Sequence, residues 1–118
     1  MFARIALMLA AGALTLATTA LAAAPPVGPL PPGPTTKISV TKGELFAVAL
    51  PGVPGRSWRL KGGYNPRLVH ELSEANVGSS IVIVFKAAGH GTTKLAYGAT
   101  RGETAKAYAA KRFTITVS

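Results

Sequence analysis

Short segments of alternating apolar and polar residues fill the last two thirds of the chain, and glycine or proline separates one segment from the next. No window of twelve or more residues free of Gly and Pro carries apolar residues at helical spacing there. A period of two is that of a strand with one buried face. Seven segments qualify, around residues 38–40, 45–50, 58–60, 67–72, 80–87, 92–97 and 113–117. The pattern predicts an all-β, immunoglobulin-like β-sandwich of about seven strands.

Two segments need a separate reading. Residues 81–85 are apolar on both faces, which predicts a central strand covered by the other sheet on one side and by loops or a partner on the other. Residues 103–111 are rich in Ala and Lys and are the one segment with a helical alternative. We expect them to form a long loop before the last strand.

Composition excludes most catalytic chemistry. A length of 118 residues allows one domain, and the absence of cysteine excludes disulfides, thiol chemistry and zinc ribbons. The only carboxylate side chains are four glutamates, and no spacing of Ser, His and Glu indicates a catalytic triad. His90 lies in a Gly-His-Gly turn, and His70 is better explained as part of a solvated strand edge than as a metal ligand. We therefore predict no enzyme, no catalytic residue, no metal site and no cofactor.

The N-terminus has the organisation of a secretory signal peptide. Arg4 gives a positive start, residues 5–21 are mostly apolar, and Ala20-Leu21-Ala22 is a small-x-small cleavage site. A retained transmembrane helix is the alternative, but the segment is rich in Ala and Thr and ends without basic anchors. We predict a signal peptide over residues 1–22 and a periplasmic or secreted mature protein, which keeps a net charge of +8 after the loss of Arg4.

A proline-rich segment follows the signal peptide. Six prolines lie between Pro25 and Pro34, so that φ is fixed repeatedly and most amide donors are missing. Neither a helix nor a central strand can form there. We predict a semi-rigid linker over residues 23–35, with recognition by an aromatic groove as the alternative, and a single domain over residues 36–118.

Basic residues surround two aromatic ones in the middle of the chain. A nucleic-acid site is one reading, because aromatic rings can stack on bases, but export argues against it, and we predict no nucleic-acid partner. We expect Trp58 to be the core aromatic of its strand. The basic residues then form a solvated face or make electrostatic contact with an anionic envelope or an acidic protein. The cluster comprises Arg56, Arg59, Lys61 and Arg67 around Trp58 and Tyr64.

Three groups of residues follow one another along the chain: Leu50-Pro51 with Gly55 and Trp58; Phe85-Lys86-Ala87-Ala88-Gly89; and Leu95-Ala96-Tyr97 with the closing Arg112-Phe113-Thr114-Ile115. In their order and spacing they resemble the chagasin family of cysteine-peptidase inhibitors. The resemblance covers residues 36–118. It implies an immunoglobulin-like fold that blocks the cleft of papain-like cysteine peptidases noncovalently with three loops at one end. We expect the protein to be a monomer.

The resemblance also implies which residues face the peptidase. Arg56 stands where the first loop of the family has an aromatic residue, and the third loop lacks the usual Arg-Pro-Trp. The alternative is therefore an envelope module of the same fold that binds proteins or has a structural role and no longer inhibits. The implied residues are Val53, Pro54, Gly55, Arg56 and Trp58 in the first loop, Gly78 and Ser79 in the second, and Ala99, Thr100, Arg101 and Gly102 in the third.

Overall fold

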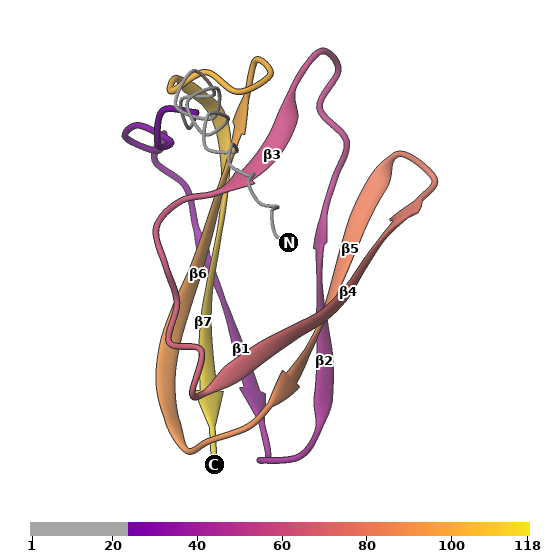
Figure 1. The fold of residues 1–118 in the computed structure, drawn as a ribbon, viewed down its shortest axis with the longest axis vertical. Coiled ribbons are helices and arrows are strands. Elements are labelled where there is room, and N and C mark those ends of the chain that lie inside the picture. Colours follow the sequence, from indigo (N-terminus) through magenta and orange to yellow (C-terminus); the bar gives the residue numbers. More distant parts are fainter. Residues whose placement is uncertain (1–23) are drawn as a thin grey trace, which may run out of the picture.

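The computed structural model describes residues 24–118 and folds them into seven strands without a helix (Figure 1). The predicted signal peptide lies outside these residues, and within them no helix is long and apolar enough to span a membrane. The strands are β1 (Thr35–Val40), β2 (Leu45–Leu50), β3 (Ser57–Leu60), β4 (Val69–Val77), β5 (Ser80–Ala87), β6 (Gly91–Thr100) and β7 (Ala107–Val117).

Two facing sheets confirm the predicted sandwich. One sheet has the strand order β1-β7-β6-β3 and the other β2-β5-β4, so that β5 is central in its sheet, as its apolar sequence predicts. Strand β1 runs parallel to β7, whereas all the other pairs are antiparallel. Ile83 and Phe85 of β5 point into the core, and Val82 and Val84, on the outer face, are half-buried.

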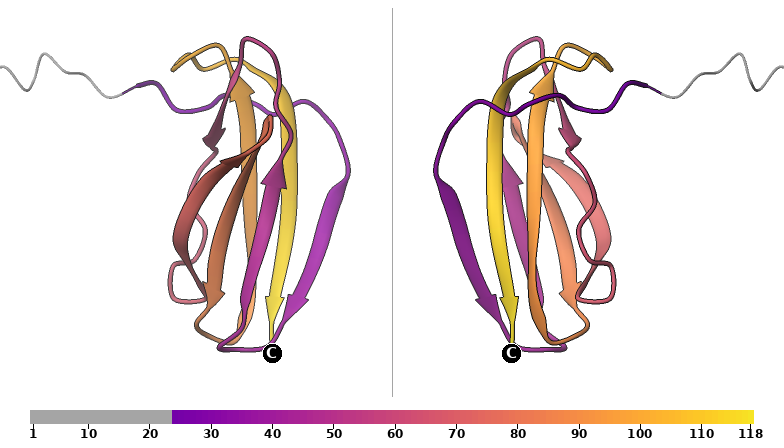
Figure 2. Two further views of the ribbon diagram at one scale, coloured as in Figure 1. Left: turned by 90° about the vertical axis from the view of Figure 1, so that its right-hand side faces the viewer. Right: turned by 90° about the vertical axis from the view of Figure 1, so that its left-hand side faces the viewer.

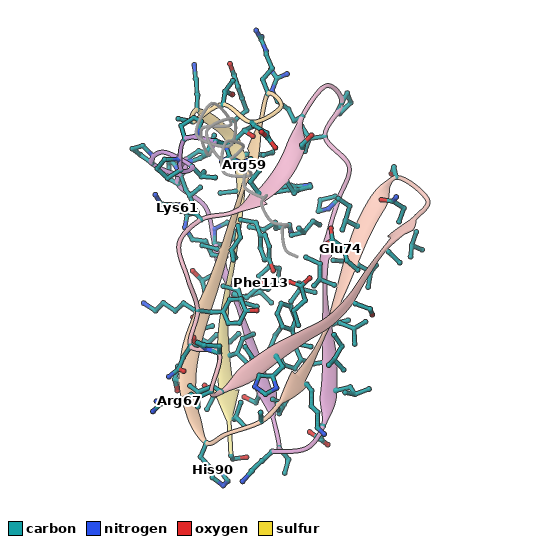
Figure 3. All side chains as sticks on the ribbon, viewed as in Figure 1. Arg59, Lys61, Arg67, Glu74, His90 and Phe113 are labelled. Atoms are coloured by element: carbon teal, nitrogen blue, oxygen red, sulfur yellow. The ribbon has the colours of Figure 1, made fainter. Side chains whose placement is uncertain are left out.

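Aromatic contacts organise the core between the sheets. The Phe85 ring stacks on Phe46 at a centroid distance of 5.4 Å and meets the edge of Tyr64 at 5.8 Å. The ring of Tyr97 packs edge-on against Phe113 at a centroid distance of 6.4 Å. Phe113 lies in the centre of the sandwich (Figure 3). Trp58 is half-buried and packs against the same cluster, which confirms its predicted place as a core aromatic.

Strand β7 begins earlier than its sequence indicates. Residues 103–111 were expected as a loop, but β7 starts at Ala107, and its first residues pair with the end of β6. Backbone pairing decides this, because an alanine-rich stretch carries no alternation, yet its amide and carbonyl groups complete the ladder that β6 extends to Thr100. Likewise β4 continues to Val77, beyond the predicted residue 72, through a bulge between Glu71 and Ser73.

The proline-rich segment lies against the sandwich over residues 24–34 and is not a free tether there. It crosses the outer face of β7 and β6 near the end of the sandwich that lies opposite the C-terminus (Figure 2). Val27 is only 5% exposed, and side chains of the sheet donate to carbonyl oxygens of the segment. Lys61 Nζ donates to Val27 at 3.2 Å and Arg112 to Pro31 at 2.7 Å. A proline-rich chain lacks amide donors but keeps its acceptors, which these outward-facing basic side chains satisfy.

The buried phenol of Tyr97 predicts a loss of stability at alkaline pH. Burial raises its pKa above the ordinary value, and the nearby carboxylates of Glu71 and Glu74 raise it further. The unfolded chain then releases this proton at a pH where the folded protein retains it, so stability falls as the pH rises above about 10. We expect the free energy of unfolding to decrease less for Tyr97→Phe than for the wild type between about pH 8 and about pH 11. Parallel pH profiles in urea titrations would contradict this.

Candidate functional site

The three predicted loops meet at one end of the sandwich, opposite the C-terminus (Figure 1). We call residues 51–56, between β2 and β3, the first loop; residues 78–79, between β4 and β5, the second loop; and residues 101–106, between β6 and β7, the third loop. The ends of all three loops are fixed in position, because each loop begins and ends in a strand that is paired in one of the two sheets.

The first loop is held by its own backbone and by Trp58. The Arg56 amide donates to the Val53 carbonyl at 3.0 Å, and the indole Nε1 of Trp58 donates to the Pro51 carbonyl at 2.8 Å. Gly55 has a φ of 72°, a conformation that favours glycine. Of the predicted residues, Gly55 and Trp58 therefore shape the loop, while Pro54 is exposed at its tip and Val53 is half-buried.

The second loop is a two-residue hairpin connection that touches the first. Gly78 has a φ of 64° and supplies the positive φ that a tight turn needs at its first position. The backbone of Gly52 passes so close to Ser79 that a Cβ at position 52 would lie 2.3 Å from the Ser79 carbonyl oxygen. Only glycine allows the two loops to approach this closely.

A pocket of about 510 Å³ lies between the first and second loops. Its apolar walls come from Val53, Pro54, Trp58 and Ile81, and its polar groups from Asn76 and Ser79 among others. Such a mixture suits a single apolar side chain flanked by hydrogen-bonding groups. Asn76 and Ile81 are not among the predicted contact residues: the sequence predicts Asn76 in the connection after the strand at 67–72, and Ile81 in the strand at 80–87.

Arg56 links the first loop to the start of β7. Its guanidinium lies over the Tyr108 ring, with 3.9 Å between Cζ and the ring centroid, and Nζ of Lys106 lies 4.9 Å from the same centroid. Within residues 24–118 the buried Nε of Arg56 has no hydrogen-bond partner. Sequence reasoning missed Tyr108, because residues 103–111 were expected to be a loop with no defined neighbour. The arrangement keeps a cation and an aromatic ring between the first and third loops.

The third loop starts later than predicted. Ala99 and Thr100 belong to β6 and are fully buried, so these two candidate contact residues do not face a partner. The exposed part is residues 101–106, with Arg101 and Gly102 at its start. The reason is again the pairing of β6 with β7, which carries β6 beyond the glycine at position 98.

Hydrogen bonds give the third loop a defined turn. The amide and the hydroxyl of Thr104 both donate to the Arg101 carbonyl, at 3.3 and 2.8 Å, and the Thr100 hydroxyl donates to the Gly102 carbonyl at 2.6 Å. Gly102 has a φ of 57°, in the left-handed region. The loop is therefore ordered around Arg101 even though it holds no tryptophan.

The remaining candidates lie away from this end. His90 is in the β5–β6 connection at the opposite end of the molecule (Figure 3), and His70 is exposed on β4. In residues 24–118, no group of three or more His, Cys, Asp or Glu side chains is placed to hold a metal ion. Arg59 and Lys61 hold the proline-rich segment, and Trp58 and Tyr64 pack on the core, so these basic and aromatic residues have structural contacts of their own.

Comparison with solved structures places the fold. The crystal structure of the cysteine protease inhibitor EhICP2 from Entamoeba histolytica superposes with a TM-score of 0.55 at 16% identity, over 73% of this chain and all of that one. The chain has a chagasin-like fold. The solution structure of amebosin gives a TM-score of 0.49 at 21% identity, over 70% of this chain and 89% of that one. No protein-family model and no curated protein matches the sequence.

Proposed function

We propose that the chain is an exported, monomeric, noncovalent inhibitor of papain-like cysteine peptidases that docks through the first, second and third loops. The observation that carries this proposal is the convergence of the three loops at one end of a fold shared with a cysteine protease inhibitor. No residue performs chemistry in this mechanism. The loops fill the cleft and exclude the substrate.

Prior order in the loops supports a blocking role. The first loop is bonded to Trp58, the second is a two-residue turn, and the third is closed on Arg101. Loops that are ordered before binding lose little conformational entropy when they dock. More of the interaction energy then remains as affinity.

Charge and shape at this end indicate the kind of surface it fits. Arg56, Arg101 and Lys106 are basic, whereas Glu103 is the one acidic residue of the first and third loops. A partner with an acidic rim would therefore associate faster at low ionic strength. In this proposal an apolar side chain of the partner enters the pocket between the first and second loops, whose walls are partly apolar.

A titration of residues 23–118 against papain tests the proposal. Residual activity is followed on adding the protein at low and at physiological salt. We expect stoichiometric inhibition at nanomolar concentrations, with slower association at the higher salt. No inhibition at micromolar concentrations would contradict the proposal.

A second candidate function is an envelope module that binds proteins without inhibiting peptidases. The absence of an aromatic residue from residues 101–106 favours it, because aromatic side chains are common anchors at interface centres. Under this candidate papain is not inhibited, and the basic protein is retained on envelope fractions in a salt-dependent way. The papain titration and a salt series of envelope pull-downs separate the two functions.

Gly52→Ala is expected to weaken inhibition by separating the first and second loops. The new Cβ would collide with the Ser79 carbonyl, which is backbone and cannot rotate away. We expect about a tenfold or larger rise in the inhibition constant, since about 1.4 kcal/mol of lost binding energy suffices. Gly63→Ala is the matched control, because a Cβ there meets nothing within 4 Å. Equal inhibition constants for the two variants would refute the role of this close approach.

A further inference from the structure

The proline-rich segment contacts the third loop as well as the sheet. The Gly28 amide donates to the Ala105 carbonyl at 2.7 Å. Arg59 of β3 donates from one guanidinium nitrogen to the Thr104 carbonyl at 2.6 Å and from the other to the Pro25 carbonyl. One arginine thus joins a strand, the third loop and the N-terminal segment.

These contacts hold the second half of the third loop, whose carbonyl groups accept no hydrogen bond from the turn of the loop itself. The internal hydrogen bonds of the loop end on the carbonyls of Arg101 and Gly102, in its first half. The carbonyls of Thr104 and Ala105, in its second half, accept from Arg59 and Gly28 instead. A loop fixed at both halves presents one conformation to a partner.

The segment is itself anchored along its length. Val27 and Leu30 fill the space that glycine leaves at position 98 of β6, where a Cβ would lie 2.8 and 2.9 Å from their side chains. Arg59 and Lys61 lie on the side of the four-stranded sheet where the segment runs (Figure 3). Prolines restrict the segment before it docks, so that little backbone entropy is lost. The support behind the third loop is therefore rigid.

We infer that Arg59 and the proline-rich segment position the third loop for binding. Residues 24–34 then contribute to inhibition by holding the docking surface in shape. The inference rests on the proposed function, because it assigns these residues a role in the same docking surface. Arg59 is a positioning residue. It contacts the backbone of the loop and acts on the partner through it.

Amide hydrogen exchange of the full mature protein, without peptidase, tests the positioning directly. The variant is Arg59→Gln, and the matched control is Arg112→Gln, which removes the same charge and the contact to Pro31 but leaves the contacts of Arg59 and Gly28 with the third loop in place. We expect exchange in residues 101–106 to accelerate about tenfold or more in Arg59→Gln alone. Arg59→Lys is expected to restore the protection only in part. Lysine keeps the positive charge, but its ammonium group lacks the planar fork that reaches two carbonyls.

Papain inhibition then tests the consequence. We expect Arg59→Gln to dissociate from papain about tenfold faster than the wild type. Equal melting temperatures of Arg59→Gln and Arg112→Gln would exclude a general loss of stability as the cause. Unchanged exchange of residues 101–106 in Arg59→Gln, or equal changes in both variants, would overturn the inference whatever papain shows. Failure of the wild type to inhibit would refute the proposed function, while the exchange data still decide whether Arg59, which is bonded to both the segment and the third loop, holds the loop in place.

Discussion

Phe85→Ala is expected to lower the free energy of unfolding by about 3–5 kcal/mol. Phe85 is fully buried in the central strand β5, stacked on Phe46 and met edge-on by Tyr64, so its removal opens a cavity that neither ring can fill from its own strand or loop. The loss exceeds that of a smaller core residue because two aromatic contacts disappear with the buried area. Urea denaturation followed by the fluorescence of Trp58, the one tryptophan of the chain, measures it.

Val84→Ala is the matched control for this prediction. Val84 is the preceding residue of β5, but it points to the outer face and is half-buried. We expect a loss of about 1 kcal/mol or less, since fewer atoms leave an already hydrated site. Equal losses for the two variants would mean that β5 does not present these residues to opposite faces.

Gly98→Val is expected to release the proline-rich segment from the sheet. Valine is favoured over glycine in a strand, so this change would stabilise β6 if nothing covered it. Its side chain instead needs the volume that Val27 and Leu30 occupy. Burying a side chain such as Val27 is worth about 1.5–3 kcal/mol, and we expect a net destabilisation of about 1–2 kcal/mol after the gain in strand preference.

Limited proteolysis and mass spectrometry measure the release. Residues 24–34 are expected to become cleavable in Gly98→Val while the strands stay protected. Gly33→Ala serves as the control, because its Cβ would meet the Arg112 side chain at an ordinary distance of 3.5 Å. A more stable Gly98→Val protein with an uncut segment would show that the segment does not dock over β6.

Much of the fold follows from local pattern. Alternation places Ile83 and Phe85 on the inner face of β5, and a run that is apolar on both faces marks this strand as central. Glycine and proline mark the connections, and the first loop falls where the sequence predicts it, whereas the second is shorter than predicted because β4 continues to Val77. Trp58, the aromatic of a short alternating strand, packs on the core as expected.

The candidate site was predictable only in part. Gly55, Gly78 and Arg101 are identifiable because turn residues and a resemblance to known inhibitors point to them. The sequence predicts Ala99 and Thr100 in a loop, but both are buried in β6, because small residues carry no alternation and the pairing with β7 makes them part of the strand. Nothing in the sequence indicates that Tyr108 lies under Arg56, because the two residues are far apart in the chain.

The sequence by itself determined the all-β class, the number of strands and the inward-facing residues, since these depend on a period of two and on turn residues within a few positions. Only the tertiary structure decided where the proline-rich segment lies and which residues make up the third loop. Both depend on contacts between distant positions. The missing side chain at Gly98 makes room for Val27, Arg59 reaches Thr104 and Pro25 together, and β7 pairs with the whole length of β6.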